Sequence, residues 1–399
     1  MKNSTKFRRL LLFFTILASG GMLVFQREVL LVLILILCIT CNQGKIFTLN
    51  KRLLPSVIMI FVILMISLVF HYYTISSLFV RFSVFIISLF LYNFYLKRSN
   101  DEFENDLFVI LKWMPFQALI TVLLALFVPF LFLTVSLSNA TYQTIFFVFT
   151  YHETIEGLSR FVRPDGLFYE PGVFQLYLNI LLYLSLFVFK KRGYSIITII
   201  AIFSTQSTTG IVICLLILSY YFFVEHLRGK PFLSKIGYGF GGIILLIPFF
   251  IIANSNIQEK LYGESKGSSM ARQYDLFTGI NVALSKPLTG IGFDYNQYKA
   301  VASGLGFQDT EMDQKSLEDR SNSNGIVFLF YSIGLPIGLL FIIGLFRQEF
   351  FSHKFLVGLI FFLSLFGETL IFTPFFLLFT YSGFGAVFFK NKNVLCDFN

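Results

Sequence analysis

Runs of about twenty apolar residues recur along almost the whole chain, and they limit the possible folds more than any other feature. The hydrocarbon core of a bilayer is about 30 Å thick, which a helix of about twenty residues can cross. Of the 399 residues, 56% are hydrophobic and 13% are charged, whereas a soluble domain carries about 25% charged residues. The sequence therefore predicts an all-α polytopic membrane protein, with residues 1–399 forming a single integral membrane domain.

The distribution of lysine and arginine predicts how the spans are oriented in the membrane. Most of the 31 lysine and arginine residues fall in short loops and tails on one side, which indicates the cytoplasmic side. The net charge of +9 is thus an orientation signal, and no nucleic-acid partner is expected. Both termini are predicted to be cytoplasmic. The twelve expected spans are 10–25, 29–41, 54–73, 78–96, 113–135, 171–189, 194–206, 208–224, 238–254, 325–346, 355–372 and 375–389.

Two long polar stretches interrupt the apolar spans, at residues 136–170 and 255–324. The predicted orientation places both stretches on the outer side. A protein that only spans a bilayer has no need of such loops. We therefore expect these two loops to form the active-site face.

The end of the first stretch combines Arg160, Arg163 and Glu170 just before a predicted span. Arginine binds phosphate through a planar, bidentate fork, and a carboxylate can act as a general base. A structural alternative exists for Glu170. With Pro171 at the first helical position, its carboxylate would cap the positive helix end.

Residues 194–224 are too long for one span and short for two. Positive clusters on both sides require an even number of crossings. We therefore expect two short helices joined by a polar turn at 206–210, near or below the outer surface. Irregular backbone at that depth needs protein or a water-filled cavity around it. A simple tight turn is the alternative.

The second stretch contains an amphipathic segment at 270–284. Its apolar residues recur every three to four positions, which predicts a helix lying along the membrane surface, with Arg272 and Asp275 off the apolar face. A tight turn at 287–293 ends it. The stretch closes at the turn 321–324, which includes Asn324.

Two ionisable residues fall within or near predicted spans. Arg81 lies about one turn inside an outer helix end, and Glu368 lies late in an apolar span. Such groups commonly face a cavity or each other. The alternative, which we favour for Arg81, is that the side chain reaches the interface.

Several of these segments resemble the bacterial O-antigen polymerase and ligase family, the Wzy and WaaL type of membrane glycosyltransferases. Order, spacing and topology agree over most of residues 160–340, and the N-terminal third matches only as hydrophobic spans. The matching segments are Arg163-x-x-Gly166 before Glu170-Pro171, the turn Ser207-Thr208-Thr209-Gly210, Arg272 ahead of Pro287-Leu288-Thr289-Gly290-Ile291-Gly292, and an Asn-containing turn before Gly334-Leu335-Pro336-Ile337-Gly338.

The resemblance implies a GT-C-like architecture in the bacterial inner membrane and sugar transfer between undecaprenyl diphosphate-linked oligosaccharides at its outer face. Membrane lipid is a further partner, and a chain-length regulator and a flippase are the proteins that such an enzyme works beside. No cofactor is expected, because no Walker-type nucleotide loop occurs and no strong motif requires a metal. Asp309, Glu311 and Asp313 could bind a hard cation, but a solvated acidic loop explains them better.

The chemistry that the resemblance implies assigns roles to named residues. Arg163 and Arg272, with Arg160 in support, are expected to stabilise the charge that develops on the leaving diphosphate. Glu170 is the candidate base, and His152 and Glu153 are the alternatives. The further candidates for substrate binding are His152, Asn324, Arg81 and Glu368.

Three functions remain open at this point. The family's ligases typically have a histidine in the turn that Ser321–Asn324 occupies here, and the histidines of this chain are elsewhere, at positions 71, 152, 226 and 353. That departure favours a polymerase of polysaccharide repeat units over a ligase that moves glycan to lipid A core. A flippase for lipid-linked sugars ranks third, because a flippase should carry charges throughout its spans.

Overall fold

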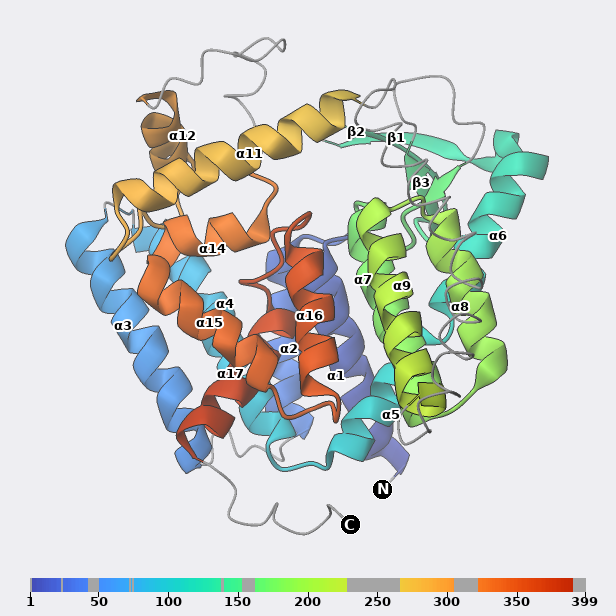
Figure 1. Cartoon of the computed structure of the whole chain (residues 1–399), viewed down its shortest axis with the longest axis horizontal. Coiled ribbons are helices and arrows are strands. Elements are labelled where there is room, and N and C mark those ends of the chain that lie inside the picture. The colour runs from blue at the N-terminus through green and yellow to red at the C-terminus, as the bar shows by residue number, and fades with distance from the viewer. Residues whose placement is uncertain are drawn as a thin grey trace. The chain divides into compact units, whose positions relative to one another are not determined.

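A computed structural model describes residues 2–22, 24–41, 50–71, 73, 75–137, 140–152, 162–227, 266–304 and 322–389. The chain divides into two compact units, each described here by itself. The first unit comprises Met1–Gly21, Phe25–Leu107 and Met270–Asn399, and the second comprises Met22–Val24 and Phe108–Ser269. The described residues are mostly helical (Figure 1), as the apolar runs predict.

The first unit is built of helices around α17, Pro374–Phe388 (Figure 1). Every residue of α17 from Pro374 to Gly385 is buried, so this helix has no lipid-facing side within the unit. It packs against α15, α4, α1 and α3. The other helices of this unit are α1 Lys2–Gly20, α2 Arg27–Cys41, α3 Leu54–Phe70, α4 Ile75–Tyr95, α5 Asn100–Leu111, which runs on into the second unit, α11 Lys266–Ser285, α12 Tyr295–Gly304, α14 Gly325–Ile333, α15 Leu335–Arg347 and α16 Lys354–Leu365.

Two glycines let α15 and α17 approach each other very closely. A Cβ added to Gly383 would lie 1.9 Å from the carbonyl oxygen of Gly344. No real side chain tolerates that distance, so the contact depends on the absence of a side chain. Small residues at a helix crossing are the usual means of close packing between membrane helices, because the backbones themselves make the van der Waals contact.

The second unit surrounds α7, Pro171–Tyr183, whose residues are almost all buried. Helices α8, Arg192–Ser204, and α9, Thr208–Phe222, pack against it. Helix α6, Met114–Phe127, packs against α8. A polar contact also joins α7 to α9, since the side-chain amide of Asn179 donates to the Gly210 carbonyl at 3.2 Å.

A four-stranded antiparallel sheet follows α6, and here the all-α prediction is wrong. Its strands run in the order β1–β4 and are Leu133–Leu137, Ala140–Ile145, Phe149–His152 and Arg163–Pro164. The predicted span 113–135 also ends too late, because α6 stops at Phe127. Pro129 disfavours helical geometry at Val128, whose φ and ψ are −138° and 52°.

Two further corrections concern the helices themselves. The predicted span 325–346 is divided into α14 and α15 at Gly334, whose φ is +81°. Helix α5 forms where a cytoplasmic loop was expected. The span predicted at 238–254 lies outside the described residues. By length and composition, five described helices can cross a membrane, and four shorter ones are apolar. The count of twelve spans and the single domain remain predictions.

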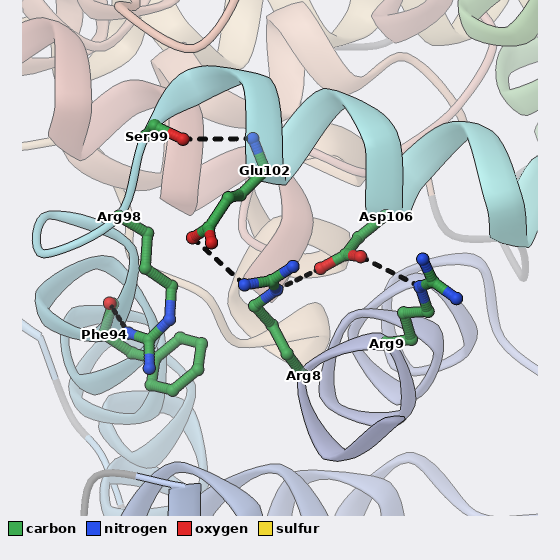
Figure 2. A network of polar contacts seen from close by, with 7 residues as sticks. All are labelled: Arg8, Arg9, Phe94, Arg98, Ser99, Glu102 and Asp106. Atoms are coloured by element: carbon green, nitrogen blue, oxygen red, sulfur yellow. Dashed lines mark hydrogen bonds and ion pairs between the residues drawn. The ribbon is translucent and has the colours of Figure 1, made fainter. Parts of the chain in front are cut away.

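Charged residues explain why α5 forms and attaches to the first unit. The Ser99 hydroxyl accepts a hydrogen bond from the Glu102 backbone at 3.3 Å, which caps the first turn. The fully buried Asp106 carboxylate pairs with Arg8 and, at 2.9 Å, with Arg9 (Figure 2). Arg8 also pairs with Glu102 at 3.0 Å. Two arginines of α1 thus hold α5 against it.

Candidate functional site

Arg163 lies in the second unit, on the last strand of the sheet. Strand β4 pairs with β3, so that Arg163 is opposite His152 in the register. The Arg163 Nε donates to the Thr205 carbonyl at 3.3 Å. Thr205 directly follows α8, at the start of the polar turn. The structure therefore brings together two segments that the sequence singled out separately.

Two short helices, α8 and α9, follow each other as predicted for residues 194–224, but their connection is shorter than the predicted turn at 206–210, because α9 begins at Thr208. Gln206 has a φ of +50°, and the Ser207 hydroxyl accepts from the Gly210 amide at 3.3 Å to cap α9. A Cβ on Gly210 would lie 2.8 Å from Gln175 of α7. The small residue and the capping serine thus have structural roles. The depth of the turn in a membrane remains a prediction.

Gly166 forms a tight turn in the segment between Arg163 and Glu170. Its φ is +65°, and an added Cβ would lie 2.7 Å from the Phe174 ring. Only glycine combines that backbone conformation with that space. The tight turn at Gly166 carries the chain from β4 to the start of α7.

Glu170 occupies the position just before α7, with Pro171 at the first helical position as expected. Its side chain makes no capping hydrogen bond and is exposed. The pKa of the nearby Tyr142 is raised to about 12, chiefly by burial and in addition by the negative charges of Asp165 and Glu170. Glu170 thus occupies the capping position that was expected, but its side chain makes no capping hydrogen bond, and its role as a base remains a prediction.

Other predicted residues of this region are described less fully. Arg160 and Glu153 lie outside the described residues. The backbone of His152 is in β3, where it pairs with Tyr142 and Arg163. The acidic segment 309–313 also lies outside the described part of the chain.

Arg272 lies in the first unit, where it is exposed on α11. The extent of α11, Lys266–Ser285, confirms the predicted helix at 270–284. Phe277, Ile280 and Leu284 leave 56%, 41% and 58% of their surface exposed. These residues form the apolar face that was expected to meet the membrane surface, and that placement remains a prediction.

Asp275 has a contact that the sequence did not reveal. Its side chain is 1% exposed and accepts hydrogen bonds from the Ser323 amide at 3.0 Å and hydroxyl at 2.5 Å. The Asp275 carbonyl accepts from the Asn322 side chain at 2.6 Å. One turn after Arg272, α11 is thus fixed to the Asn-containing turn. In the sequence, the only sign of this contact was that the Asp275 carboxylate lies off the apolar face of the helix.

The two glycine-containing motifs of the first unit bind each other through their backbones. Ile291 donates to the Tyr331 carbonyl at 2.7 Å, and Gly292 donates to the Ser332 carbonyl at 3.1 Å. In return, Leu335 donates to the Pro287 carbonyl at 2.7 Å. The segment 287–292 therefore occupies the break between α14 and α15, which explains why both motifs occur together in one sequence.

Asn324 and Glu368 have evident structural roles. The Asn324 side-chain oxygen accepts from Ile326 at 3.0 Å and Val327 at 3.1 Å, which caps α14. Glu368 is 9% exposed and lies in the non-helical segment between α16 and α17, not within a span. A Cβ on Gly325 would lie 2.3 Å from the Glu368 carbonyl, so the two backbones are in contact.

Arg81 is exposed on α4 and lines two cavities of the first unit. Arg27 and Glu28, at the start of α2, line the larger one with it. Neither Arg27 nor Glu28 was among the site residues predicted from the sequence. The available signal was the position of two charged residues just ahead of a predicted span.

A family model described as O-antigen ligase matches residues 193–319. The match includes the turn at 206–210, Arg272 and the segment 287–292, whereas Arg163, Glu170 and Asn324 lie outside it. No curated protein and no solved structure matches the chain. This part of the chain is thus similar to the O-antigen ligase family, and the apolar helices are compatible with a membrane protein.

Proposed function

We propose that this protein is a polymerase that joins polysaccharide repeat units linked to undecaprenyl diphosphate, at the outer face of the inner membrane. The family match over 193–319 supports glycan transfer in general, and the choice of a polymerase is carried by the turn before α14, whose residues 321–324 include no histidine. The matched region holds Arg272 and the backbone-paired segment 287–292, which are the most specific features of the first unit. A GT-C-like arrangement of twelve spans with both termini in the cytoplasm belongs to the same proposal.

In the proposed reaction, a sugar hydroxyl of the incoming repeat unit attacks the anomeric carbon of the growing chain. A glycosidic bond forms as the bond from that carbon to the diphosphate breaks. The hydroxyl proton passes to a base, and undecaprenyl diphosphate leaves with the bonding electron pair. The diphosphate linkage already carries the activation energy, so the proposal needs neither a nucleotide nor a metal.

Negative charge increases on the leaving diphosphate, and positioned cations lower the barrier to its departure. We assign this role to Arg163 and Arg272, with Arg160 in support. The exposure of Arg272 on a helix that is fixed through Asp275 supports its part. The attachment of Arg163 to the Thr205 carbonyl supports a defined position for its guanidinium.

Glu170 is the proposed general base. Its carboxylate is exposed and makes no capping hydrogen bond, which leaves its oxygens accessible to a substrate hydroxyl. Its neighbours Arg163 and Asp165 belong to the same unit and the same segment of chain. His152 and Glu153 remain the alternative bases in this proposal.

The turn before α14 supports a polymerase over a ligase. Its residues 321–324 include no histidine, and the side chains of Asn322, Ser323 and Asn324 bond to Tyr298, to Asp275 and to the α14 backbone. These residues build the turn. A ligase remains the second candidate, because the description of the matching family model favours it.

Reconstitution tests the proposal directly. The purified protein in liposomes would receive undecaprenyl diphosphate-linked repeat units from the source cell, first alone and then with lipid A core. A ladder of products from the repeat units alone supports a polymerase. Glycan transfer that occurs only when lipid A core is present would establish the ligase instead.

A further inference from the structure

Two neighbouring cavities lie within the first unit, and they have different chemical character. The larger has a volume of about 330 Å³ and is bounded by α2, α4 and the phenylalanines Phe85, Phe293, Phe328 and Phe372. The smaller has a volume of about 140 Å³ and includes Tyr295, Tyr298 and Tyr331 with Asn322, Asp294 and Thr369. The larger cavity therefore combines phenylalanine walls with charged side chains, and the smaller one is lined by tyrosines and polar side chains.

Arg81 lines both cavities, together with Phe293 and Phe328. Of the residues that the structure describes, Arg81 is therefore the one charged residue that the two cavities share. Arg27 adds a second guanidinium to the larger cavity, and Glu28 adds one carboxylate. The formal charge of the larger cavity is then positive, which suits an anion bound beside apolar walls.

The walls of both cavities are held in place by ring packing and hydrogen bonds. Tyr298 and Tyr331 stack with their ring centroids 4.8 Å apart, and the Asn322 side chain donates to the Tyr298 hydroxyl at 3.1 Å. Phe293 packs against Phe372 at 5.0 Å, and its amide donates to the Tyr73 hydroxyl at 2.5 Å. Such walls are formed before a ligand arrives, which lowers the entropic cost of binding.

We propose that these two cavities bind the head of a lipid-linked saccharide, with its diphosphate at Arg81 and Arg27. The first sugar lies in the smaller cavity, where aromatic faces and polar groups can bind a sugar ring. The start of the polyprenyl chain lies against the phenylalanines of the larger cavity. The order of tyrosine-lined cavity, arginines and phenylalanine walls matches the order of sugar, diphosphate and lipid in such a molecule.

This inference rests on the proposed function, because it names how one substrate of that reaction is held. It adds Arg27 and Glu28, which lie outside the family match, and Tyr331 and Thr369 of the smaller cavity, which also lie outside it. A polymerase has two lipid-linked substrates. Among the described residues, all those that line the two cavities belong to the first unit.

Direct binding tests this inference without depending on catalysis. The purified full chain in nanodiscs would be titrated with undecaprenyl diphosphate, with undecaprenyl diphosphate-linked N-acetylglucosamine, and with inorganic diphosphate. The substitutions Arg81→Gln and Arg27→Gln should each weaken binding of both lipids about tenfold or more, because each removes a charged hydrogen-bond donor. Arg347→Gln is the control, since Arg347 is exposed and lines neither cavity.

Variants of the smaller cavity separate the sugar from the lipid. Tyr295→Leu and Thr369→Val alter partly exposed residues that line it. Both should reduce the extra affinity for the sugar-linked lipid and leave the affinity for undecaprenyl diphosphate unchanged.

Three results would overturn the inference. Binding of both lipids by the Arg81 and Arg27 variants at wild-type strength would exclude this site and leave the proposed function standing. If inorganic diphosphate bound as tightly as the two lipids, the site would recognise only the anion and neither the sugar nor the polyprenyl chain. Wild-type protein that binds neither lipid would overturn the proposed function as well.

Discussion

The carboxylate of Asp275 accepts two hydrogen bonds from one residue, the amide of Ser323 at 3.0 Å and its hydroxyl at 2.5 Å. These residues are far apart in sequence, and the carboxylate is 1% exposed. The contact fixes the helix that bears Arg272 to the turn before α14. We therefore regard Asp275 as a positioning residue, since it acts on the site through Arg272.

Removing the Asp275 carboxylate should loosen this connection. Asp275→Ala leaves the half-buried hydroxyl and amide of Ser323 without this acceptor, at a cost of about 1–3 kcal/mol in unfolding free energy. Asp275→Asn keeps one acceptor oxygen and should be intermediate. Thermal unfolding in detergent and the glycan ladder of complemented cells measure the two effects. Asp101→Asn, at an exposed site, is the control, and an Asp275→Ala protein with wild-type stability and activity would contradict this account.

The contact between Gly344 and Gly383 should not tolerate a methyl group. Gly383→Ala would place Cβ 1.9 Å from the Gly344 carbonyl, and we expect a loss of about 1–3 kcal/mol through overpacking. Gly193→Ala is the matched control, because nothing lies within 4 Å of its added Cβ and alanine favours a helix. Equal unfolding temperatures for the two variants would refute the close packing of α15 and α17.

Arg163→Lys tests whether a bidentate fork is needed. Lysine keeps the positive charge but replaces the planar guanidinium by a point charge, so we expect turnover to fall about tenfold or more. The conservative control is Arg192→Lys, an exposed position at the start of α8. Full activity of Arg163→Lys in the reconstituted assay would argue against bidentate diphosphate binding by this residue.

Glu170→Gln separates a catalytic role from a capping role. Loss of a general base typically lowers a rate by about 10²- to 10⁴-fold. Because the Glu170 side chain makes no cap, the same variant should keep the wild-type unfolding temperature. Single-turnover rates and thermal unfolding are the paired measurements. A less stable but fully active protein would restore the capping interpretation.

The sequence predicted the helices well where a long apolar run ends at a clear polar boundary. Helices α2, α7 and α17 begin or end within two residues of the expected limits. The turn at 206–210 was predicted from length and charge alone. Pro171 and the apolar periodicity at 270–284 likewise led to the observed helix start and helix.

The failures have physical causes that lie outside a simple apolar pattern. The sheet at 133–164 is stabilised by pairing between strands that a hydropathy pattern does not reveal. Helix α5 carries many charges and depends on the pairing of Asp106 with Arg8 and Arg9. The buried contact of Asp275 with Ser323 joins distant segments, and no periodicity predicts such a contact.

The most direct test of the central claim is to delete the gene and separate the cell's surface and lipid-linked glycans on a gel. We predict single repeat units in place of a ladder, restored to a ladder by the wild-type gene but not by Arg163→Gln or Arg272→Gln. Long chains that accumulate on the carrier lipid, with none at the surface, would contradict the polymerase and indicate a ligase. Single units trapped at the cytoplasmic face would indicate a flippase.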